Sequence, residues 1–185
     1  MVSADSLAAN WRSGGALVVC RHDPASTGLW ASAVVPKDKL LPMARDLLSQ
    51  GFMVLDLSTV ETKEGFLLTW HFECLENPIR VALRVLVTRE IPRCPSLYPV
   101  YQGAEWHERE SCDFFGVSFI GNPNMVPLLL ADDFEGPPPL LKEPGALASM
   151  ASLGFFGTPE VLDPAWGPLV GGNEASSPAS EGGGE

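Results

Sequence analysis

Apolar and polar positions follow two different periods along this chain. Apolar residues three or four positions apart predict a short helix over residues 3–12 and a longer one over residues 37–50, each followed by glycine. The longer helix has a predicted apolar face made of Leu40, Leu41, Ala44, Leu47 and Leu48. Short strands are expected at residues 16–21 and 29–35, with a turn-rich loop between them.

Strict alternation begins after Gly51 and predicts three strands joined by short turns, over residues 53–60, 66–75 and 79–88. Met53, Leu55 and Leu57 share one side of the first strand. In the third strand, Arg80 and Arg84 point away from the apolar side. Such an antiparallel meander buries one face and leaves the other exposed to solvent. The helix with the leucine-rich face is expected to pack on the buried face.

A third helix is predicted over residues 104–115, AEWHERESCDFF, with Gly116 as its stop. It carries four carboxylates and one arginine. Glu105, Arg109 and Asp113 lie four apart and predict a ladder of ion pairs on one face. Spacing alone favours a surface helix with a paired arginine, while acid–base chemistry by paired carboxylates is the functional alternative.

Composition changes after residue 131. Residues 1–131 carry 14 acidic and 11 basic residues, whereas residues 132–185 carry 9 acidic residues and only Lys142, within a net charge of −11. Nucleic acid is excluded as a partner, because it requires a basic surface. We expect an irregular extension over residues 145–170 and a disordered acidic tail over residues 171–185.

No stretch has the roughly 18 to 20 apolar residues of a membrane span, and the start lacks a basic segment followed by an apolar run. The sequence therefore predicts a soluble protein of the cytoplasmic compartment, with membrane contact only through partners.

Candidate ligands for metals are scattered. The cysteines lie far apart, at Cys20, Cys74, Cys94 and Cys112. Without CxxC or zinc-like spacing they are expected to be reduced thiols, and an iron–sulfur site would require the fold to gather them. Asp132, Asp133 and Glu135 are a conceivable carboxylate metal site, but a solvated acidic turn is favoured. No phosphate-binding loop or nucleophile–base pair accompanies these groups, so the sequence predicts no catalytic, cofactor or metal site.

The run EWHERESCDFFGVSFIGNPN, followed by LLLADDFEGPPPLLKEP, resembles the signature of the C subunit of respiratory complex I, the proton-translocating NADH–quinone oxidoreductase. The first part matches in register at Trp106, Glu108, Arg109, Glu110, Asp113, Phe115, Gly116, Phe119, Gly121 and Pro123. The second part matches at Phe134, Glu135, Gly136 and Leu140. The resemblance extends over residues 37–144. The same domain occurs in C-like subunits of membrane-bound energy-converting nickel–iron hydrogenases and formate hydrogenlyases.

Pattern and resemblance together imply an α+β fold, with an antiparallel sheet of about three to five strands covered by helices, a C-terminal half of helix plus loop, and a disordered tail. The expected divisions are an N-terminal helix and short strands (1–36), an α+β domain like that of the complex I C subunit (37–144), the irregular extension (145–170) and the tail (171–185).

The resemblance also implies a role in electron transport. The chain would be a non-catalytic scaffold in the peripheral arm at the cytoplasmic face of the membrane, docked on a D-like subunit related to hydrogenase large subunits. It would hold no cofactor, while partner subunits hold iron–sulfur clusters and a flavin or nickel–iron centre. The matched residues, except Leu140, would form or brace the partner interface. The alternatives are a C-like hydrogenase subunit and a small stand-alone carboxylate-dependent enzyme.

Overall fold

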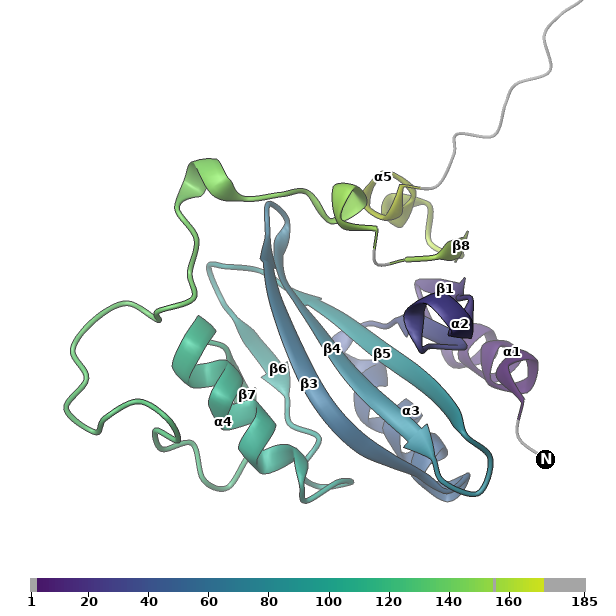
Figure 1. Cartoon of the computed structure of the whole chain (residues 1–185), viewed down its shortest axis with the longest axis horizontal. Coiled ribbons are helices and arrows are strands. Elements are labelled where there is room, and N and C mark those ends of the chain that lie inside the picture. Colours follow the sequence, from purple (N-terminus) through teal and green to yellow (C-terminus); the bar gives the residue numbers. More distant parts are fainter. Residues whose placement is uncertain (1–2, 155, 172–185) are drawn as a thin grey trace, which may run out of the picture.

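The protein is built around a mixed six-stranded sheet with the order β3-β4-β5-β2-β1-β8 (Figure 1). The computed structural model describes residues 3–154 and 156–171. The sheet consists of β1 Val18–Arg21, β2 Ala31–Val34, β3 Phe52–Thr62, β4 Gly65–Cys74, β5 Ile79–Val87 and β8 Thr158–Val161. A separate parallel pair consists of β6 Arg93–Pro95 and β7 Ser118–Ile120.

Helices lie on both sides of this sheet. The α-helices are α1 Ala4–Gly14, the one-turn α2 Pro24–Thr27, α3 Lys37–Ser49, α4 Ala104–Phe115 and the short α5 Gly167–Val170. Three 3₁₀ turns follow α4, η1 Pro144–Ala146, η2 Met150–Leu153 and η3 Pro164–Trp166. The α+β architecture with a helix-covered sheet is confirmed.

The sheet extends beyond the predicted meander of β3, β4 and β5. β2 joins β5 in parallel, with Ala31 opposite Val81, and β8 pairs antiparallel with β1 at the far edge. A parallel neighbour is joined through a crossover and not through a turn, so local sequence gives no sign of it.

One core fills the face of the sheet covered by α1, α3, β6, β7 and α4. α3 contributes Leu40, Ala44 and Leu47, as predicted, together with Met43. The predicted face included Leu48, which is wrong, because that side chain is 47% exposed. The buried face of α3 therefore includes Met43 in place of Leu48, and its residues lie three or four positions apart, in agreement with the helical period.

β3 contains a β-bulge between Val54 and Asp56. The extra residue reverses the alternation of side chains along the strand. Leu57 therefore faces the core, whereas Met53 and Leu55 are exposed. The prediction that these three side chains share one side is wrong for this reason.

Residues beyond 145 cover part of the opposite face of the sheet, around the upper ends of the strands in Figure 1. Met150, Phe156 and Val170 are buried against Leu67 and its neighbours in a second apolar cluster. Arg84, predicted to point into water, is only 4% exposed beneath this segment. Within residues 145–170, which were expected to form an irregular extension, strand pairing and three buried apolar side chains offset the ordering entropy.

The predicted tail at residues 171–185 lies outside the described residues, apart from Gly171. No helix in the described part of the chain is long and apolar enough to span a membrane.

Candidate functional site

The signature helix α4 packs beside β3 and ends where the sequence predicts, at Gly116, whose φ of +73° is in the left-handed region that glycine adopts freely. Ser111 Oγ lies 2.6 Å from Thr59 Oγ1 on β3. The Phe115 ring meets the ring of Phe66 on β4 edge-on, with centroids 6.3 Å apart. These contacts fix how the helix faces the sheet.

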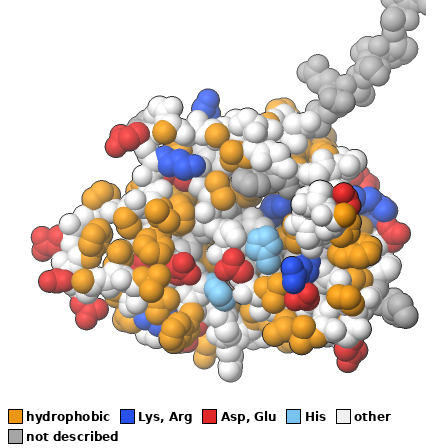
Figure 2. Space-filling model, in the orientation of Figure 1, with side chains coloured by type: hydrophobic (Ala, Val, Ile, Leu, Met, Phe, Trp, Pro, Cys, Tyr) orange, Lys and Arg blue, Asp and Glu red, His pale blue; other side chains and the backbone are white. Residues whose placement is uncertain are grey.

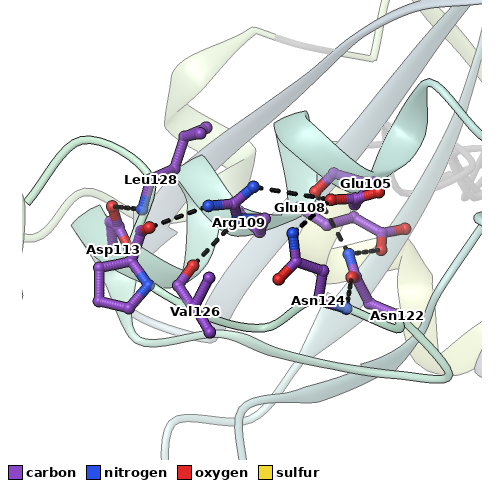
Figure 3. A network of polar contacts seen from close by, with 9 residues as sticks. Glu105, Glu108, Arg109, Asp113, Asn122, Asn124, Val126 and Leu128 are labelled. Carbon is purple, nitrogen blue, oxygen red and sulfur yellow. Dashed lines mark hydrogen bonds and ion pairs between the residues drawn. The ribbon is translucent and has the colours of Figure 1, made fainter.

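Glu108 is fully buried on the inner side of α4. Its carboxylate accepts hydrogen bonds from the Leu97 amide (2.6 Å) and from Ser96 Oγ (2.6 Å). A third comes from Asn122 Nδ2 at 2.9 Å (Figure 3). Burial raises the pKa of Glu108, and the three hydrogen bonds oppose that rise. The side chain thereby joins the turn before α4 to the loop after β7.

Arg109 is 9% exposed and points at main-chain carbonyls. Its Nε donates to the Val126 oxygen at 3.0 Å, and its Nη2 donates to the Pro127 oxygen at 2.9 Å (Figure 3). Nη1 forms an ion pair with Glu105 Oε1 at 3.6 Å. Among the described residues, this pair is the one part of the predicted ladder that forms at ion-pair distance.

Asp113 binds backbone amides rather than continuing the ladder. Its Oδ2 accepts from three consecutive amides, those of Leu128 (2.9 Å), Leu129 (2.8 Å) and Leu130 (3.1 Å). Figure 3 shows the first of these bonds. Burial opposes ionisation, but these amides and the charge of Arg109 bring the net pKa of Asp113 below its usual value.

We call residues 121–130 the strap, because this loop is held along α4 and runs in the same direction as the helix. Asn122 and Asn124 lie at the first turns, where Asn124 Nδ2 donates to Glu105 Oε1 at 2.8 Å. The middle of the strap lies at Arg109 and its end lies at Asp113 (Figure 3). Four charged side chains of α4 thus form hydrogen bonds with the polar groups on the inner side of the strap, which has no regular secondary structure.

The outer side of the strap and its surroundings is apolar. The exposed fractions are 54% for Val126, 60% for Leu129, 58% for Ile120 and 63% for Trp106. Phe134 and Leu140 are also among the exposed large apolar side chains. Figure 2 shows hydrophobic side chains gathered over α4 and the loop after it. Exposed apolar side chains gathered on one side of a protein are typical of interaction sites.

The structure divides the predicted signature residues into an inner and an outer group. Glu108, Arg109 and Phe119 are buried, and Asp113, Phe115 and Gly116 are partly buried. The exposed members are Trp106, Glu110, Gly121, Pro123, Phe134, Glu135 and Gly136. In the inner group, Glu108, Arg109 and Asp113 bind the strap, whereas Phe115 and Phe119 pack on aromatic rings of the sheet.

Sequence reasoning missed Asn122 and Asn124 as partners of the helix carboxylates. The available signal was two amide side chains on either side of Pro123, directly after the strand that follows the helix. Such side chains commonly order turns by bonding to nearby backbone groups, as Asn122 Oδ1 does with the Asn124 amide at 2.9 Å.

The acidic residues and cysteines considered above as metal ligands are not placed as a metal-binding group in the described part of the chain. Asp132, Asp133 and Glu135 are exposed. The four cysteines are free, and burial raises the pKa of Cys20 to about 11. Within the described ranges, no group of three or more histidine, cysteine or acidic side chains is placed to hold a metal ion.

Comparisons with known proteins agree on one relationship. Residues 33–146 match the family described as "Respiratory-chain NADH dehydrogenase, 30 Kd subunit". The C subunit of an NADH-quinone oxidoreductase from Mycolicibacterium paratuberculosis (strain ATCC BAA-968 / K-10) is 48% identical over 78 residues, which are 42% of this chain and 33% of that relative. The matched stretch therefore spans only a third of the relative's length.

Two solved structures are similar. A trypsin-resistant fragment of Nqo5 superposes with a TM-score of 0.56 at 22% identity, covering 65% of this chain and 97% of the fragment, and this likeness shows the fold alone. A chain of the membrane-bound sulfane sulfur reductase, an archaeal respiratory membrane complex, gives a TM-score of 0.52 at 30% identity, covering 56% of this chain and 64% of that one.

Proposed function

The chain belongs to the family of the 30 kDa subunit of respiratory-chain NADH dehydrogenase, and we propose that it acts as a scaffold that docks on a neighbouring subunit through α4 and the strap. The family makes it a subunit of an oxidoreductase complex. The finer proposal is that the neighbour is the D-like subunit, which is related to hydrogenase large subunits. Clusters and flavin would lie in the partner subunits, which would also provide any contact with the membrane.

The observation that carries this proposal is the construction of the strap. Its inner backbone groups are bound by Arg109 and Asp113, and its Asn124 side chain is bound by Glu105, so its outer apolar side chains are held in place before any partner arrives. A surface that is already ordered loses less conformational entropy on association and so binds more tightly. Val126 and Leu129, both more than half exposed, belong to this surface.

The roles of the charged side chains favour a scaffold over a stand-alone enzyme. Glu108 and Asp113 accept hydrogen bonds from main-chain amides, and Arg109 donates to main-chain carbonyls. A general acid or base needs an orientation toward substrate, and these groups are oriented toward the protein's own loops.

A second candidate is a C-like subunit of a membrane-bound complex that does not reduce quinone. The likeness at 30% identity to a chain of the sulfane sulfur reductase supports it. The docking surface would be the same in both cases, and the two candidates differ in the complex that co-purifies with the chain.

The docking proposal is tested by the double substitution Val126→Glu, Leu129→Glu in cells that express the whole complex. Both side chains are more than half exposed, so the isolated chain should keep its melting temperature while its recovery in the complex falls at least tenfold. Leu75→Glu is the matched control, because Leu75 is 71% exposed at the β4–β5 turn. Normal assembly of the double variant would contradict the proposal.

A further inference from the structure

A cavity of about 310 Å³ opens on the face of the sheet opposite α3, away from the core described above. β3, β4, β5, the loop around α2 and the C-terminal segment contribute to its walls. Leu29, Val60 and Leu67 make the walls largely apolar, and His22, His71 and Arg84 supply the polar groups. In Figure 2 a histidine side chain borders a hollow near the centre of the visible face.

Arg84 is a buried charge without a counterion. Its Nη1 donates to Ser32 Oγ at 2.6 Å, and its Cζ lies 5.4 Å from the centre of the Phe156 ring. Its Nε is buried and has no hydrogen-bond partner among residues 3–154 and 156–171. Within the same ranges, no carboxylate lies at ion-pair distance from it. Arginine keeps its charge at neutral pH, and an unpaired buried charge is strongly unfavourable.

The groups next to Arg84 are uncharged at neutral pH. Burial raises the pKa of Cys20 to about 11, so this thiol does not provide an anion. Burial, and secondly the charge of Arg84, lowers the pKa of His22 to about 4 and lowers that of His71 as well, with Asp56 opposing the shift at His71. The cavity thus holds one cation and two neutral imidazoles.

A hydrogen-bond chain leads from the guanidinium to one of these imidazoles. Ser32 Oγ accepts from Arg84, so its own proton is free to point to His22 Nε2, 2.7 Å away. This hydrogen bond fixes the His22 ring at the cavity wall. Arg84 itself contacts one hydroxyl and one aromatic ring, so some of its N–H donors remain available to a ligand.

We propose that this cavity binds a small monocarboxylate, a molecule with one carboxylate group and a short apolar part, with Arg84 as the counterion. One buried cation matches one negative charge, and the guanidinium fork matches the geometry of a carboxylate. The apolar walls match an aliphatic or aromatic body, and the volume is at the small end for ligand cavities. The inference does not rest on the docking function, because the cavity and the strap are separate surfaces.

The test is an NMR titration of the full chain with hexanoate, with hexanol and inorganic phosphate as comparison probes. Hexanoate should shift the ring signals of His22 and His71 and the Gly157 amide in a saturable way. Hexanol, which has the same body without the charge, should bind at least tenfold more weakly, and phosphate should have no saturable effect. Equal binding of hexanol, saturation by phosphate alone, or no saturation by hexanoate would overturn the proposal.

Variants assign the site. Arg84→Met should abolish hexanoate binding, whereas Arg80→Met on the same strand should not, because Arg80 is exposed and paired with Glu73 at 3.0 Å. Should Arg84→Met fail to fold, Val60→Phe fills the cavity and retains the charge, and it should also abolish binding. Binding that survives in folded Arg84→Met or in Val60→Phe would refute the assignment.

The remaining source of a carboxylate is the chain's own acidic C-terminus. A variant lacking residues 172–185 should give unchanged His22 and His71 signals before hexanoate is added, and unchanged binding afterwards. Shifts of those signals on removal of the segment alone would identify a glutamate of the chain as the occupant, and would overturn a small-molecule site.

Discussion

At the scale of residues, the charged side chains of α4 show why a periodic pattern does not determine what a side chain binds. The spacing of Glu105, Arg109 and Asp113 predicts mutual ion pairs, but Asp113 takes three amides and Arg109 takes two carbonyls. A loop with unsatisfied backbone groups competes for the same charges. The strap is close to α4 in the sequence and in space, but no periodic pattern of residues predicts the path of such a loop.

Arg109→Ala should loosen the strap more than it weakens the fold. Two carbonyls lose their donors, which costs about 1 to 3 kcal/mol locally. Hydrogen exchange of the amides at residues 128–130 should become at least tenfold faster, while recovery of the chain in the complex falls. Glu110→Ala, on the exposed side of the same helix, is the control and should change neither. Unchanged exchange in Arg109→Ala would show that the strap is ordered by other means.

Acid should weaken the fold through His22. Its pKa is about 4 in the folded chain against an ordinary value of 6.5, so the unfolded chain takes up the proton first as the pH falls. Stability should therefore be full above pH 6.5 and decline toward pH 4. Urea unfolding at several pH values measures this decline, and His22→Asn should reduce it. An equal decline in His22→Asn would place the effect at other groups, among them His71, whose pKa is also lowered.

At the scale of elements, the sequence predicted those whose signal is local. The bounds of α4 and the meander of β3, β4 and β5 follow from period and turn residues. The bulge in β3, the parallel pairing of β2 with β5 and the edge strand β8 depend on partners far along the chain. The burial of Arg84 could not be predicted for the same reason, because the residues that cover it lie beyond 145.

The C-terminal segment should contribute measurably to stability. Phe156 is 2% exposed in the second apolar cluster, so Phe156→Ala should cost about 3 to 5 kcal/mol of unfolding free energy. Phe134→Ala provides the comparison, because Phe134 is 46% exposed, and it should cost less than about 1 kcal/mol. Similar losses measured by urea unfolding would mean that residues beyond 145 do not pack on the sheet.

At the scale of the whole molecule, two surfaces differ in their chemistry. The side with α4 and the strap presents apolar side chains outward, while the opposite face of the sheet is partly covered by the C-terminal segment and contains the Arg84 cavity. The family could be inferred from the signature in the sequence. That its inner residues act on their own chain could not, because a charged side chain in a motif gives no indication of whether its partner is internal or external.

In the intact complex the strap should face another polypeptide. Photo-cross-linking tests this contact, with p-benzoylphenylalanine in place of Leu129 and, as control, in place of Leu75. We expect a cross-link from position 129 to one neighbouring subunit, identified by mass spectrometry, and a much lower yield from position 75. Cross-linking from position 75 but none from position 129 would contradict this expectation.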